Sequence, residues 1–134
     1  MSGEENRPRR VLFVCNGNTC RSPMAAAYAN HALPNVEAES AGTFAAGAPA
    51  NPLAVALMRE RFNIDLRGHV SRVVSDLDLG DFDLISRLSD VQVPARGPML
   101  SWDIEDPVGR GPAAYQAALN AIIKQIDALP PELQ

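Results

Sequence analysis

The sequence predicts an α/β fold: a single three-layer domain built on a four-stranded, mostly parallel sheet. Three observations support this prediction. Short apolar segments of strand length alternate along the chain with segments of helical spacing, which is typical of β-α-β units with parallel strands. Two of the expected helices begin at a Ser-Pro or an Asn-Pro step, and the last begins at about Pro112. Neither an internal repeat nor a linker interrupts the 134 residues, so one domain of ordinary size is expected.

The first unit is a strand followed by a helix. Residues 9–14 (RRVLFV) form an apolar run that is too short for a helix and fits a buried strand. Ser22 is a good N-cap, and Pro23 suits the first position of the helix that follows. Strong helix formers continue this helix until Pro34 ends it.

A second strand and helix follow. Residues 36–40 (VEAES) alternate in polarity and predict a strand, and a loop of small residues comes after it. A helix is expected to follow over residues 51–62, with Asn51 as its cap and Pro52 at its first position.

Two further strands and a last helix complete the fold. The third strand is expected within residues 81–88 and the fourth within 99–104, where Trp102 is expected in the core. The last helix is expected over residues 112–129, where apolar residues recur at helical spacing. These residues are Tyr115, Leu119, Ile122, Ile123 and Ile126.

Composition and charge exclude several classes of protein. The chain is 46% hydrophobic and 21% charged, with a net charge of −4, which argues against nucleic acid or an acidic membrane as a partner. No apolar run approaches the ~18 residues of a membrane span. Residues 1–8 are expected to form a disordered lead-in to a domain over 9–134. The two cysteines, without an export signal, indicate a reducing, cytoplasmic location.

The stretch VLFVCNGNTCRSP, residues 11–23, carries the strongest functional signal. It places a polar loop between a strand and a helix N-terminus, where main-chain N–H groups and the helix dipole attract anions. Gly17 and Asn18 allow a tight turn, and Arg21 supplies donors for a tetrahedral oxyanion. The same positive field favours the thiolate form of Cys15, a nucleophile. The simpler alternative is two buried cysteines beside a helix cap.

The segment CNGNTCRSP resembles the active-site signature of the low-molecular-weight protein tyrosine phosphatases and of the arsenate reductases that share their flavodoxin-like fold. The resemblance implies that Cys15 attacks phosphorus, that Arg21 holds the equatorial oxygens and that Ser22 stabilises the thiolate. It also implies that Cys20 can form a protective disulfide with Cys15 under oxidation. The implied phosphate-binding residues are Asn16, Gly17, Asn18, Thr19, Cys20, Arg21 and Ser22. Of these, Asn18 and Ser22 are also implied to support the loop.

The resemblance extends over residues 9–128. ESAGT places Ser40 among the residues that support the loop, and the segment ending at RGHVSR makes His69 the supporting histidine. WDIEDPVG resembles the mobile segment with the general acid, here Asp106. Without the resemblance, Ser40 would simply end a strand, His69 would be an ordinary histidine and Asp106 would begin a turn.

The sequence also departs from the family pattern. Val108 occupies a position that is aromatic in members that cleave phosphotyrosine, so one aromatic wall is expected to be missing. SRLSD stands where the family has an apolar run ending in Met-Asp, and Ser89 rather than Asp90 aligns with that aspartate. The short stretch over 90–102 is expected to leave the rim of the pocket open. It contains no cysteine for an internal disulfide relay.

Three functions remain open. The leading hypothesis is a cysteine-dependent phosphatase acting on phosphotyrosine in proteins or on small aryl phosphates, without a cofactor or metal. The second is an arsenate reductase that uses an external low-molecular-weight thiol or Cys20. The third is a non-catalytic module that binds an oxyanion. Inorganic phosphate or arsenate is the expected ligand of the loop in each case.

Overall fold

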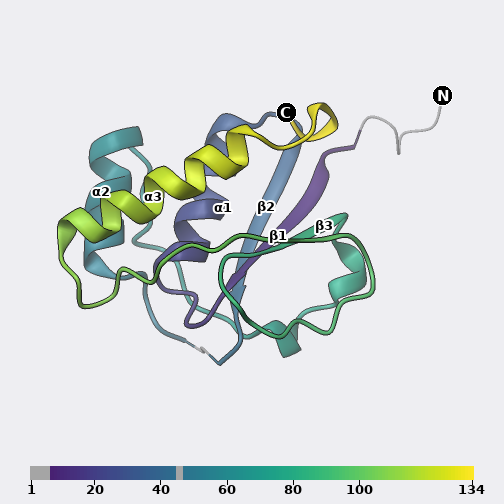
Figure 1. The fold of residues 1–134 in the computed structure, drawn as a ribbon, viewed down its shortest axis with the longest axis horizontal. Coiled ribbons are helices and arrows are strands. Elements are labelled where there is room, and N and C mark those ends of the chain that lie inside the picture. The colour runs from purple at the N-terminus through teal and green to yellow at the C-terminus, as the bar shows by residue number, and fades with distance from the viewer. Residues whose placement is uncertain (1–6, 45–46) are drawn as a thin grey trace.

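A computed structural model describes residues 7–44 and 47–134 (Figure 1). It confirms the predicted α/β fold, with four strands and three α-helices in the predicted order. The strands are β1 (Arg9–Cys15), β2 (Val36–Gly42), β3 (Leu84–Arg87) and β4 (Met99–Ser101). The helices are α1 (Arg21–Ala32), α2 (Pro52–Phe62) and α3 (Pro112–Asp127). Most of the expected N-terminal lead-in, residues 1–6, lies outside the described residues.

All four strands are parallel, in the order β2-β1-β3-β4. The register pairs Cys15 with Gly42 and Val14 with Arg87. The carboxyl ends of β1, β2 and β3 therefore meet at one edge of the sheet, where ligands bind in folds of this kind. The loop between β1 and α1 leaves the sheet at this edge.

The residues of β1 alternate between two separate cores. Val11, Phe13 and Cys15 pack with the three α-helices, which Figure 1 shows on one side of the sheet. Leu12 and Val14 pack on the opposite face. There the cover consists of two short 3-10 helices, η2 (Val74–Asp76) and η3 (Leu79–Asp81), and of the segment over 89–99. The second outer layer is therefore built from turns and loop in the described part of the chain.

The ends of the elements differ slightly from the predictions. Helix α1 begins at Arg21, so Cys20 and not Ser22 occupies the N-cap position. The Ser22 hydroxyl does not cap the helix because it is buried against Cys15. Asn51 caps α2 as predicted, since its side-chain oxygen accepts a hydrogen bond of 3.0 Å from the N–H of Leu53. Trp102 is buried as expected and packs 5.8 Å, between ring centroids, from Phe13.

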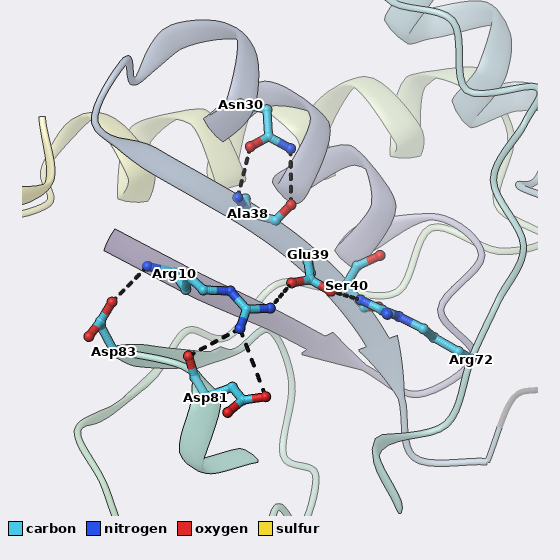
Figure 2. Close-up of polar contacts among 8 residues, drawn as sticks. All are labelled: Arg10, Asn30, Ala38, Glu39, Ser40, Arg72, Asp81 and Asp83. Carbon is cyan, nitrogen blue, oxygen red and sulfur yellow. Dashed lines mark hydrogen bonds and ion pairs between the residues drawn. The ribbon is translucent and has the colours of Figure 1, made fainter. Parts of the chain in front are cut away.

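Strand β2 lies at an edge of the sheet, and a side chain of α1 satisfies its outer main chain. The amide of Asn30 accepts a hydrogen bond of 2.7 Å from the N–H of Ala38 and donates one of 3.0 Å to its oxygen (Figure 2). This pair imitates the ladder of a neighbouring strand. It fixes the main chain of β2 just before its last residues, which lie beside the loop.

A helix that crosses a membrane has to be both long and apolar. None of the helices in the described part of the chain combines the length and the apolar composition that a membrane-spanning helix needs.

Candidate active site

The loop over residues 16–20 turns sharply between β1 and α1. Asn18 adopts a left-handed conformation, with φ of 54°, which asparagine tolerates better than most residues. The turn brings Cys15, at the end of β1, and Arg21, at the start of α1, to the same pocket. The structure therefore joins the two residues that the sequence predicted as nucleophile and oxyanion ligand.

The pocket above the loop has a volume of about 490 Å³. Its lining residues are Cys15, Asn16, Gly17, Thr19, Cys20, Arg21, Phe44, Ala48, Asp106 and Val108. Two residues predicted to bind phosphate, Asn18 and Ser22, are not among them. Both are fully buried behind the loop, so their side chains support the loop instead of contacting a ligand.

The side chains of Asn18 and Ser22 form a hydrogen-bonded chain that ends at Cys15. The amide nitrogen of Asn18 donates to the Ser22 hydroxyl over 2.8 Å. The same hydroxyl lies 3.0 Å from the Cys15 sulfur and 3.4 Å from the main-chain oxygen of Ala41. Because Asn18 occupies one lone pair, the single Ser22 proton is free for the shorter contact. A thiolate at Cys15 would accept that proton as a charge-assisted hydrogen bond.

Asn18 is held in turn by the segment over residues 69–73. The Nε2 atom of His69 lies 2.7 Å from the Asn18 main-chain oxygen, so a proton on Nε2 makes a hydrogen bond there. The main-chain N–H of Arg72 donates to the Asn18 side-chain oxygen over 2.9 Å. His69 therefore contacts the main chain of the loop that the family resemblance expects it to support. Ser40 joins the network through its main-chain oxygen, which accepts a hydrogen bond of 3.0 Å from Arg72 Nε.

Arg21 connects the loop to the segment that contains the predicted acid. Its side chain is buried, and one terminal nitrogen donates to the main-chain oxygen of Ile104 over 2.8 Å. The other terminal nitrogen lies 3.8 Å from a carboxylate oxygen of Asp106. Within the described residues, the buried Nε has no hydrogen-bond partner. A buried donor of this kind is costly unless a ligand satisfies it.

The side chain of Asp106 lies at the wall of the pocket and is about half exposed. Its second carboxylate oxygen accepts a hydrogen bond of 3.0 Å from the N–H of Val108. Val108 lines the same pocket, as the sequence suggested, but so does Phe44, whose exposed fraction is 74%. The pocket therefore has an aromatic side chain that the sequence analysis did not identify.

The two cysteines are free thiols, and both are buried. Burial, together with the neighbouring Cys15, raises the pKa of Cys20 from an ordinary value of 9.0 to about 11. At neutral pH the Cys20 thiol is therefore protonated and a poor nucleophile. Cys15, in contrast, lies 3.0 Å from the Ser22 hydroxyl and lines the pocket.

The altered segment SRLSD does not reach this pocket. Ser89 and Asp90 line a second hollow of about 300 Å³ with Arg87, Ser101, Trp102 and Asp103. Neither residue is among those that line the active-site pocket. Over residues 7–44 and 47–134, no group of three His, Cys, Asp or Glu side chains could hold a metal ion.

Comparison with known proteins finds relatives that match most of the chain. Residues 10–99 match the family model for low molecular weight phosphotyrosine protein phosphatase. A probable low molecular weight protein-tyrosine-phosphatase, EpsP of Ralstonia solanacearum, is 35% identical, and the match covers 94% of this chain and 97% of EpsP. A protein-arginine-phosphatase of Geobacillus stearothermophilus is 37% identical, over 95% of this chain and 97% of the relative.

Solved structures agree with the sequence matches. An arsenate reductase from Archaeoglobus fulgidus superposes with a TM-score of 0.77 and 35% identity, covering 86% of this chain and 94% of that one. Vibrio vulnificus Wzb in complex with benzylphosphonate gives a TM-score of 0.77 and 28% identity, covering 87% and 92% of the two chains. The fold is thus common to proteins with different named activities.

Proposed function

The chain belongs to the low molecular weight phosphotyrosine protein phosphatase family, and on this premise we propose that it is a cysteine-dependent phosphatase. Its substrates are phosphotyrosine or other aryl phosphate monoesters, and the reaction passes through a phosphocysteine intermediate. The observation that carries this proposal is the arrangement of Cys15, Arg21 and Asp106 around one pocket. It supplies a nucleophile, a ligand for the phosphoryl oxygens and an acid.

In the first step, the Cys15 thiolate attacks phosphorus in line with the ester oxygen. The sulfur–phosphorus bond forms as the phosphorus–oxygen bond breaks, and Asp106 gives its proton to the departing oxygen. The main-chain N–H groups of the loop and Arg21 stabilise charge on the three equatorial oxygens. Ser22 lies 3.0 Å from the sulfur and stabilises the thiolate before attack.

In the second step, water attacks the phosphocysteine. Asp106, now ionised, removes a proton from this water. The oxygen–phosphorus bond forms, the sulfur–phosphorus bond breaks, and Cys15 leaves as a thiolate with Ser22 beside it. Inorganic phosphate is released and Asp106 is again protonated, so the cycle consumes only water.

Phe44 supports an aryl group as the preferred leaving group. Its ring is largely exposed at the pocket, where it can contact a phenyl ring by stacking or by its edge. Wzb, a related structure, holds benzylphosphonate, an analogue with an aromatic ring. The name of the Geobacillus relative makes phosphoarginine the main competing substrate. A reducing cytoplasm would keep the Cys15 thiol available for either reaction.

Arsenate reduction is the second candidate function. Val108 replaces an aromatic residue at the pocket, and a similar structure of 35% identity is an arsenate reductase. Cys15 would attack arsenic and release water, and an external thiol would then attack the Cys15 sulfur. That attack forms a mixed disulfide and releases arsenite, so two thiols are oxidised for each arsenate reduced. Either Cys20 or a second external thiol then attacks the mixed disulfide. The sequence has no third cysteine, so an external thiol is needed in both cases to return Cys15 to its reduced form.

Turnover by wild type and Cys15→Ser tests these alternatives. Fully reduced protein is assayed with an aryl phosphate, with phosphoarginine and with arsenate plus a thiol. Steady hydrolysis of the aryl phosphate by wild type alone is expected. Hydrolysis of phosphoarginine alone would change the substrate class, and thiol consumption that depends on arsenate would favour the second candidate. Binding of phosphate without any turnover would contradict an enzymatic function.

A further inference from the structure

The carboxylate of Glu39, on the face of β2 away from the helices, contacts two arginines at once. We propose that Glu39 is a positioning residue that acts on Cys15 through Arg72; Figure 2 shows the contacts of Glu39 with Arg10 and Arg72. The inference rests on the proposed function, in which Cys15 is the nucleophile. Neither Glu39 nor Arg72 lines the pocket, so their role is to support the loop and not to take part in the chemical step.

Each oxygen of the Glu39 carboxylate is paired with a different arginine. Oε1 accepts a hydrogen bond of 2.6 Å from a terminal nitrogen of Arg72, and Oε2 pairs with Arg10. The hydrogen bond from Arg72 and then the one from Arg10 lower the pKa of Glu39 against the opposing effect of burial. Both arginines therefore favour the ionised form of the Glu39 carboxylate.

Arg10 is itself held in place by several contacts, so it can hold the Glu39 carboxylate in one position. The N–H of Arg10 donates to Asp83 over 2.8 Å, and its guanidinium donates to the main-chain oxygen of Asp81 over 3.4 Å. The guanidinium also lies 4.8 Å from the centroid of the Phe82 ring. Figure 2 shows Arg10 between Glu39 on one side and Asp81 and Asp83 on the other. Arg10 thereby restricts the orientations open to Glu39.

Arg72 uses its side chain and its main chain for different contacts. The guanidinium is held on β2 by Glu39 and by the main-chain oxygen of Ser40, 3.0 Å from Nε. The main-chain N–H donates to the side chain of Asn18, and the main-chain oxygen accepts a hydrogen bond of 2.9 Å from Gly42. Fixing the guanidinium on β2 therefore fixes the N–H that orients the Asn18 amide.

The contacts continue from Asn18 to the nucleophile. Asn18 has a single orientation in which its oxygen accepts from Arg72 and its nitrogen donates to Ser22. A rotated or displaced amide would compete for the Ser22 proton that the Cys15 thiolate needs. Arg72 lies outside any helix or strand, next to an isolated bridge between Gly42 and Val73. The side-chain contact with Glu39 adds to this main-chain support.

The substitution Glu39→Gln tests the proposal, and Glu37→Gln is its matched control. Glu37→Gln removes the same charge from the same face of β2, but the Glu37 side chain is exposed. With an aryl phosphate, we expect Glu39→Gln to lower kcat about 10-fold, as for a small displacement of a reacting group, with KM changed less than about twofold. Glu37→Gln should stay within about twofold of wild type in both constants.

A second readout does not depend on turnover. The rate of Cys15 alkylation by iodoacetate at about pH 6 reports the thiolate fraction, and Glu39→Gln should lower it while Glu37→Gln leaves it unchanged. Loss of alkylation in Glu39→Gln supports the positioning role even if wild type hydrolyses no phosphate ester, which would reject only the proposed function. Equal alkylation and kcat in the two variants would overturn the positioning role.

Arg72→Gln provides an independent check if Glu39→Gln is poorly folded. If Glu39 acts through Arg72, Arg72→Gln alone should lower kcat and alkylation to a similar extent. The double variant should then show little further loss, because both substitutions break the same connection. If the fold-losses of kcat in the two single variants multiply in the double variant, Glu39 does not act through Arg72.

Discussion

Gly42 lies directly against the main chain of Asn16. A Cβ built at Gly42 would stand 2.5 Å from the Asn16 main-chain oxygen and 3.0 Å from the main-chain nitrogen of Asn18. Both atoms belong to the active-site loop, and neither is the end of a flexible side chain. The last residue of β2 therefore has to be glycine so that the loop can pack against the sheet.

Gly42→Ala should impair catalysis by displacing the loop. Since misplacement of a reacting group by about 1 Å can cost roughly 100-fold, we expect kcat/KM for an aryl phosphate to fall by about that factor. Gly97→Ala is the matched control, because a Cβ at Gly97 meets no atom within 4 Å. Steady-state kinetics of the two variants measure the difference. Activity of Gly42→Ala equal to that of Gly97→Ala would show that the loop tolerates the shift.

Asp106→Asn should remove the general acid, and the loss should depend on the leaving group. General acid catalysis typically contributes about 100- to 10,000-fold, so a large fall in kcat is expected for an ester whose alcohol is weakly acidic. An ester with a strongly acidic phenol needs less protonation and should lose much less in its first step. Asp103→Asn, in the same segment, is the control. A loss independent of the leaving group would argue that Asp106 acts only through Arg21.

Alkylation should separate the two cysteines by pH. Because the pKa of Cys20 is raised to about 11, chiefly by burial, its thiol is expected to resist iodoacetamide at neutral pH. Mass spectrometry of digested protein should therefore find the label on Cys15 first. Label on Cys20 should increase only as the pH approaches 11. Equal labelling of both cysteines at neutral pH would contradict this difference in environment.

Acid should weaken the fold through Asp83. The paired Arg7 side chain lowers the pKa of Asp83 from 3.8 to about 2, and the N–H of Arg10 adds to this effect. The ionised carboxylate is thus favoured in the folded state. Its contribution, about 1 to 2 kcal/mol, is complete above pH 3.8 and disappears as the pH falls through 2.

Urea unfolding of Asp83→Asn as a function of pH checks this expectation. The variant should be less stable than wild type at neutral pH, and the difference should shrink as the pH falls from 4 toward 2. Asp90→Asn removes an exposed carboxylate. At neutral pH its free energy of unfolding should differ less from that of wild type than the value for Asp83→Asn does. A difference between wild type and Asp83→Asn that is constant with pH would contradict the assignment.

The fold and the centre of the site could be predicted because their signals are local. Cys15 and Arg21 stand in one continuous loop between a strand and a helix, and the spacing of apolar residues marks both elements. The predicted N-cap at Ser22 was wrong for a tertiary reason. Its hydroxyl contacts Cys15 and Asn18 in the folded chain, and local cap preference cannot anticipate that competition.

The supporting residues could not be predicted because their contacts join distant parts of the chain. Arg72 lies in a segment without helical or strand periodicity, so nothing local shows that its N–H meets Asn18. Glu39 looks like an ordinary polar residue of an alternating strand. Phe44 follows β2 in a loop of small residues, and its place at the pocket depends on how that loop packs.

Trapping the covalent intermediate tests the central claim most directly. Protein mixed with a ³²P-labelled aryl phosphate is quenched in acid within the first turnover, digested and mapped by peptide mass. The mechanism predicts one phosphate group per active chain, bound to Cys15 and absent from the Cys15→Ser variant. Asp106→Asn should retain the label longer, because Asp106 also activates water. Turnover without any phosphate bound to protein, or phosphate on Cys20 or on another residue, would contradict the assignment of Cys15 as the nucleophile.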